Sequence, residues 1–121
     1  MENCVKLVSY LFHSRTQAHI FHLQTNSFAE HKALNDYYDD IVDLVDGLVE
    51  SYQGKYGIIK GYLNFNLANY ENKEQVLGYF EALLNKVETL RQENKDSYIQ
   101  NQIDSVVELI ESTLYKLRNL N

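Results

Sequence analysis

The sequence contains no proline, no tryptophan and a single cysteine, and five of its 121 residues are glycine. With so little to interrupt a helix, the chain is predicted to be mostly α-helical. The lone Cys4 excludes an internal disulfide and predicts a reducing, cytoplasmic location. No run of about eighteen apolar residues is present, so we expect no membrane span. The N-terminal residues also lack the pattern of a signal peptide, because Lys6 and His13 break the short apolar stretch.

Basic residues are also scarce, since the sequence has 11 Lys and Arg but 17 Asp and Glu, which gives a net charge of −6. This balance disfavours nucleic-acid binding, which depends on cations that neutralise phosphates. It favours cations as ligands, although solubility alone also explains it. With 45% hydrophobic and 23% charged residues, the chain is predicted to form one globular domain over residues 1–121. Ten tyrosines suit half-buried seams and subunit contacts.

Apolar periodicity predicts four helices, over residues 3–24, 28–53, 73–94 and 97–119. Ser27 and Glu30 fit a capping box at the start of the second helix, and Gly54 fits its C-cap. Asn72 is the expected cap of the third helix. The less regular residues 54–72 are interpreted as a crossover with a short helix near 58–69. Two hairpins joined by one longer connection predict an all-α, ferritin-like four-helix bundle.

Histidines and acids at helical spacing form the candidate site. His19 and His31 lie twelve residues apart, and Asp46 and Glu50 follow on the same predicted helix as His31. At 100° per residue, one flank of that helix is a column of polar side chains beside the apolar stripe, made of His31, Asn35, Asp39, Asp43, Asp46 and Glu50. Imidazole and carboxylate groups are donors with which helical bundles hold iron. The alternative is a solvated acidic face whose repulsion is screened by water and salt.

The stretch that runs from Ala18-His19 through Phe28-Ala29-Glu30-His31-Lys32-Ala33-Leu34-Asn35 to Asp46 and Glu50 resembles the ferroxidase signature of Dps-type miniferritins. In that family two histidines lie twelve residues apart, and an Asp/Glu pair follows fifteen and nineteen residues after the second histidine. The resemblance implies an iron site made by His19 and His31 of one chain with Asp46 and Glu50 of the partner subunit. It also implies oxidation of Fe(II) by peroxide or oxygen. His22, Asn35 and Asp39 are predicted auxiliary ligands.

The chain departs from the family in three ways. Asn35 stands where the family has an acid, Ile20 stands where it commonly has tryptophan, and the chain is short and lacks a basic tail. The short, tailless form resembles small Dps-like proteins of bacteriophages. We therefore expect a homo-oligomer, either a dimer or a larger assembly such as a hollow cage, without a nucleic-acid partner. The alternative function is that of a non-catalytic bundle that binds a protein partner or sequesters a small ligand.

Overall fold

All four predicted helices form, and no predicted bound differs from the observed one by more than three residues. The structure is a computed structural model that describes residues 2–121, so Met1 of the predicted domain lies outside it. The helices are α1 (Glu2–Gln24), α2 (Phe28–Tyr56), α3 (Lys73–Gln92) and α4 (Ser97–Asn119). The described residues contain no strand, which confirms the all-α prediction.

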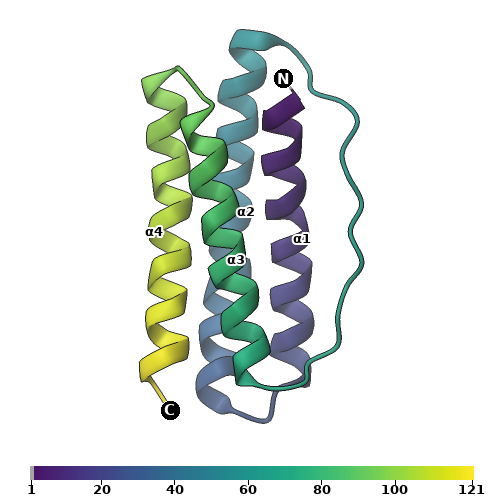
Figure 1. Cartoon of the computed structure of the whole chain (residues 1–121), viewed down its shortest axis with the longest axis vertical. Helices are drawn as coiled ribbons and strands as arrows, with labels where there is room; N and C mark the ends of the chain where they lie inside the picture. The colour runs from purple at the N-terminus through teal and green to yellow at the C-terminus, as the bar shows by residue number, and fades with distance from the viewer. Residues whose placement is uncertain (1) are drawn as a thin grey trace.

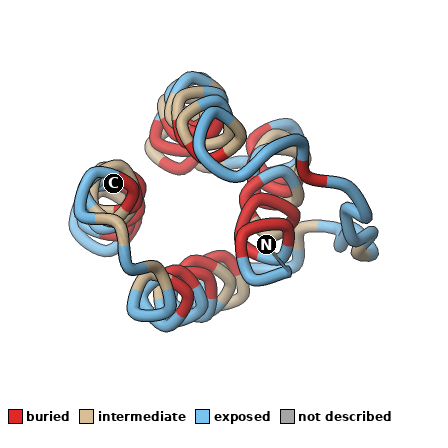
Figure 2. The backbone as a smooth tube through the Cα atoms, turned by 90° about the horizontal axis from the view of Figure 1, so that it is seen from above, coloured by how far each residue is buried: buried red, intermediate tan, exposed pale blue. Residues whose placement is uncertain are grey.

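The helices form a four-helix bundle in which α1 contacts α2 and α3, and α4 contacts the same two helices. Figure 1 shows that α2 and α3 run in one direction and α1 and α4 in the other. Every helix is therefore antiparallel to both of its neighbours. Seen along the bundle, the buried residues of each helix face the centre (Figure 2). None of the four described helices combines the length and the hydrophobicity that a membrane span requires.

The core contains aromatic as well as aliphatic side chains, and one of them is a fully buried tyrosine. The ring of Tyr37 is fully buried and meets Phe80 edge to face, with ring centroids 5.0 Å apart. Ser14 donates its only hydroxyl proton to Leu11 O at 2.7 Å, so the Tyr37 hydroxyl donates to Ser14 Oγ, also at 2.7 Å. Burial raises the pKa of Tyr37 above its ordinary value. Phe12 on α1, by contrast, is 44% exposed.

The start of α2 confirms half of the predicted capping box. Ser27 Oγ accepts a hydrogen bond from Glu30 N at 3.2 Å. The second hydrogen bond of the box, from Ser27 N to the Glu30 carboxylate, is not formed. The Glu30 carboxylate instead accepts hydrogen bonds from the hydroxyls of Thr25 and Tyr70, each at 2.7 Å. Glu30 thereby fastens the start of α2 to the end of the crossover.

The C-cap of α2 is Gly57 instead of the predicted Gly54. The helix continues for one more turn, and Gly57 N donates to Gln53 O at 2.9 Å. Gly57 has a φ of 94°, which lies in the region that favours glycine.

The predicted short helix over 58–69 is wrong, because residues 57–72 form an extended strap along the outside of α1 (Figure 1). A segment without helix or sheet needs other partners for its backbone groups. Here polar side chains of α1 supply them. The bonds are Leu63 N to Ser9 Oγ at 2.9 Å, His13 Nε2 to Asn66 O at 2.8 Å, Ala68 N to Gln17 Oε1 at 2.8 Å, Gln17 Nε2 to Ala68 O at 2.9 Å, and Tyr70 N to Gln24 Oε1 at 2.6 Å.

We expect Gln17→Ala to destabilise the protein. Gln17 is 1% exposed and bonds both backbone groups of Ala68, so its loss should lower the free energy of unfolding by about 1–3 kcal/mol. Urea unfolding followed by far-ultraviolet circular dichroism measures this change. The matched control is Gln92→Ala, at an exposed position of α3. Equal stability of both variants would contradict the role given to Gln17.

A polar clasp closes the other end of the bundle. Asp96, in the turn between α3 and α4, accepts hydrogen bonds from Lys55 Nζ and the Tyr56 hydroxyl at the end of α2. These bonds to Lys55 and Tyr56 hold the pKa of Asp96 below its ordinary value. They raise the pKa values of Lys55 and Tyr56 in turn.

The clasp predicts a stability difference that depends on pH. The pKa of Asp96 is lowered by folding, so its contribution is complete above the unfolded-state pKa of about 4 and fades as pH falls through the lower folded value. The wild-type protein should therefore melt at a higher temperature than Asp96→Asn at pH 6. The two should converge under acid conditions in differential scanning calorimetry. A melting difference that persists below both pKa values would refute this assignment.

Candidate metal site

Three histidines gather where α1 ends and α2 begins. His19 and His22 lie one turn apart on α1, and His31 lies in the first turn of α2. The short turn over residues 25–27 brings the two helices together, so that His22 is buried and the other two rings are half-buried. Both predicted histidine ligands, His19 and His31, and the predicted auxiliary His22 therefore lie together at the junction of α1 and α2.

His22 and His31 are joined by two reciprocal hydrogen bonds. His22 Nδ1 lies 2.7 Å from His31 O, and His31 Nδ1 lies 2.9 Å from His22 O. The two rings stack with centroids 3.7 Å apart and an interplanar angle of 21°. A carbonyl oxygen can only accept, so each Nδ1 carries the proton. In the neutral rings, the lone pair is therefore on Nε2, as it is in histidines whose Nε2 binds a metal.

His19 is held by a different contact. Its ring stacks on Tyr38 with centroids 4.2 Å apart, and its edge faces His22 at 5.9 Å. The Tyr38 hydroxyl donates to Asn35 Oδ1 at 2.7 Å, and Asn35 Nδ2 donates to Asp39 Oδ2 at 3.1 Å. The two remaining predicted auxiliaries, Asn35 and Asp39, thus extend from the histidine cluster along the exposed flank of α2.

The two predicted acidic ligands lie away from this cluster. Asp46 and Glu50 are exposed on α2 and make no hydrogen bond or ion pair with the described residues. They follow His31 by fifteen and nineteen residues, which at 1.5 Å per residue is about 22 and 28 Å along the helix axis. Within residues 2–121 no three or more His, Cys, Asp or Glu side chains are close enough to hold one metal ion. One chain therefore supplies two separate parts of the predicted site.

Two members of the cluster were not predicted as such. The sequence predicts His22 as an auxiliary ligand, whereas in the structure it is the ring on which His31 stacks. Tyr38 is partly buried against the core and its ring stacks on His19. The available signal was that His19 and His22 share one helix face and that Tyr38 lies seven residues after His31.

The hydrogen bonds predict the tautomer of three histidines. His22 and His31 should carry their proton on Nδ1. His13 is the internal control, because its Nε2 lies 2.8 Å from Asn66 O and its Nδ1 lies 2.8 Å from the Tyr79 hydroxyl. His13 should therefore carry its proton on Nε2.

Long-range ¹H–¹⁵N correlation spectra of the imidazole rings at neutral pH or above measure this pattern. Two rings protonated on Nδ1 and one, His13, on Nε2 is the expected result. Protonation of His22 or His31 on Nε2 would show that the reciprocal bonds are absent in solution.

Comparison with known proteins gives one match. The sequence model of one family covers residues 22–117, and this family is described as a family of unknown function (DUF5856). No curated protein and no solved structure matches the chain. The matched range includes His22, His31, Asn35, Asp46 and Glu50 but begins after His19.

Proposed function

The chain belongs to the DUF5856 family, and we propose that it is a ferritin-like, Dps-like protein that binds Fe(II) at a site completed by two copies of the chain. In this proposal His19 and His31 of one copy share iron with Asp46 and Glu50 of the partner subunit. His22, Asn35 and Asp39 assist as neighbours of the ligands. Iron is the substrate, and its oxidation by peroxide or oxygen is the proposed reaction.

The observation that carries the proposal is the pair of reciprocal bonds between His22 and His31. These bonds hold the rings in the tautomer that presents an Nε2 lone pair, and they fix the rings before any ligand arrives. Preorganised imidazoles beside carboxylates are a donor set that suits Fe(II) among the first-row metals. The bundle also has the one long crossover between its second and third helices that ferritin-like folds use.

Helix geometry indicates how two copies would complete the site. When two α2 helices pair antiparallel about a two-fold axis, residues whose numbers have a constant sum lie opposite each other. His31 paired with Asp46 gives a sum of 77, and His31 paired with Glu50 gives 81. The two-fold axis passes the residue whose number is half of such a sum, because that residue lies opposite its own copy. For a sum midway between these two values, that residue is close to Asp39. The two copies would then form two equivalent sites, one at each end of the α2 seam.

The same geometry makes the dimer sensitive to cations. Asp39 would approach Asp39 of the partner subunit at the axis, and the exposed Asp43 and Asp46 add further negative charge to each seam. Like charges at such a seam repel each other unless a cation lies between them. Binding of a divalent metal is therefore expected to strengthen the dimer, and this expectation follows from the shared site alone.

The residues of the chain would act mainly through position and charge. The acidic flank of α2 draws Fe(II) towards the seam, and the histidines with the acids of the partner subunit hold it. Two Fe(II) ions each give one electron to one hydrogen peroxide molecule, which takes up two protons and leaves as two waters. The protein would thereby remove both reactants of the radical chemistry that iron and peroxide otherwise undergo.

A second candidate function is that of a bundle that kept this arrangement and binds a protein partner or small ligand without oxidising iron. Asn35 favours it, because its amide already bonds Tyr38 and Asp39 and is a poorer ligand than the acid expected there. Leu23 and Phe28, which are 69% and 78% exposed beside the histidines, would suit such a partner.

An aerobic Fe(II) titration followed by near-ultraviolet absorbance tests the proposal. The wild-type protein should oxidise Fe(II) saturably and faster than buffer. His31→Ala and Glu50→Ala should each slow oxidation roughly 10-fold or more, because each removes a donor. Glu111→Ala, at an exposed position on α4 without an ion pair, should behave as wild type and serves as the matched control.

Sedimentation velocity with and without Mn(II), used as a redox-stable substitute, completes this test. We expect Mn(II) to shift wild-type protein towards a dimer or larger assembly, and Glu50→Ala to abolish the shift. Wild-type oxidation at the rate of buffer would eliminate the ferroxidase function. If Mn(II) then also left the sedimentation unchanged, only the second candidate function would stand.

A further inference from the structure

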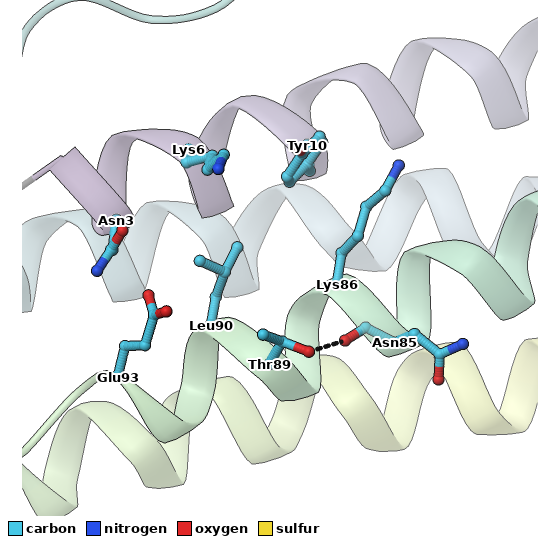
Figure 3. A pocket seen from close by; sticks show the side chains of 8 residues that line it. All are labelled: Asn3, Lys6, Tyr10, Asn85, Lys86, Thr89, Leu90 and Glu93. Atoms are coloured by element: carbon cyan, nitrogen blue, oxygen red, sulfur yellow. Dashed lines mark hydrogen bonds between the residues drawn. The ribbon is translucent and has the colours of Figure 1, made fainter.

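The seam between α1 and α3 contains a groove that the proposed iron site does not use. It has a volume of about 290 Å³ and is lined by Asn3, Lys6, Tyr10, Asn85, Lys86, Thr89, Leu90 and Glu93. Figure 3 shows Lys6 and Tyr10 on α1 across from Lys86 and Leu90 on α3. Both helices thus contribute polar side chains to one groove, with an apolar leucine between them.

Two lysines line this groove in an otherwise acidic protein. Neither Lys6 nor Lys86 forms an ion pair with any described residue. By contrast, an aspartate forms an ion pair with each of Lys32, Lys55 and Lys116. Lys86 Nζ lies 4.7 Å from the centroid of the Tyr10 ring. This cation–π contact holds the ammonium group beside the groove while leaving its charge without a counter-ion.

A second, aromatic cavity adjoins the first. Its volume is about 270 Å³, and it shares Tyr10 and Lys86 with the groove. The remaining lining includes Phe65, which stacks on Tyr10 with centroids 5.0 Å apart, and Tyr79. His13 also lines it, and both of its ring nitrogens are engaged by Asn66 O and the Tyr79 hydroxyl. This cavity is thus lined by aromatic rings that stack and form hydrogen bonds, and Lys86 lies at its border.

We propose that the α1–α3 seam binds a small organic anion that carries a flat ring. The anionic group lies between Lys6 and Lys86, and Asn85 also lines this part of the groove. The ring occupies the aromatic cavity beside Tyr79. Together the two cavities fall within the size range of pockets that hold small molecules, about 300–1,000 Å³.

The position of Glu93 fixes the orientation of this ligand. Glu93 lies near Asn3 at one end of the groove, and Lys86 lies at the other end (Figure 3). Seven residues of α3 separate them, which is about 10 Å along the helix. The carboxylate of Glu93 repels an anion from its own end, so the anionic group settles towards Lys86, which borders the aromatic cavity.

Isothermal titration calorimetry of the full chain with four probes tests this inference. Adenosine monophosphate and benzoate each combine a ring with an anion, and they distinguish a phosphate from a carboxylate. Adenosine and inorganic phosphate each carry one of the two features. We expect at least one combined probe to bind saturably and at least tenfold more tightly than either single-feature probe.

Variants locate the binding. Lys6→Gln and Lys86→Gln should each weaken the combined probe roughly tenfold, because each removes one charge-assisted contact. Lys73→Gln, an unpaired lysine at the far end of α3 from Glu93, should leave binding unchanged. Absence of saturable binding by both combined probes overturns the proposal, as does binding that Lys6→Gln and Lys86→Gln leave intact. His31→Ala should not change this binding, so its outcome is independent of the iron site.

Discussion

The length of the straight helix α2 keeps the predicted histidine and acidic ligands of one chain apart. His31 lies in the first turn of α2, whereas Asp46 and Glu50 lie fifteen and nineteen residues further along the same helix. No rotation of side chains closes about 20 Å. The predicted histidine and acidic ligands therefore lie in two separate places on one chain. The proposed site therefore requires a pair of chains.

The histidine rings at the junction of α1 and α2 are held by specific contacts. Reciprocal hydrogen bonds between His22 and His31 connect the end of α1 with the start of α2, and they set the tautomer of both rings. The same junction is fastened by Glu30, which accepts hydrogen bonds from Thr25 and Tyr70. The turn between the two helices is thus held by both sets of hydrogen bonds, and in the proposed function the same imidazoles also bind the metal.

Much of the fold could be predicted from the sequence because its signals are local. The absence of proline, the apolar periodicity and the caps at Ser27 and Asn72 determine four helices with nearly correct bounds. The crossover could not be predicted in the same way. Its apolar and polar residues mimic a short helix, but its conformation is set by hydrogen bonds to Ser9, Gln17 and Gln24 on a distant helix. Helical spacing also placed His19 beside His22, whereas the stacking of His22 on His31 depends on how two helices cross, which the sequence pattern does not encode.

The shared iron site is tested most directly by anomalous diffraction from crystals of the protein soaked anaerobically with Fe(II). The account predicts an iron peak within bonding distance of His31 Nε2 and of the carboxylates of Asp46 and Glu50 of the partner subunit, repeated about the two-fold axis. An iron peak bound by residues of one chain alone, or crystals in which these histidines and acids of different copies stay apart and iron does not bind, would contradict it.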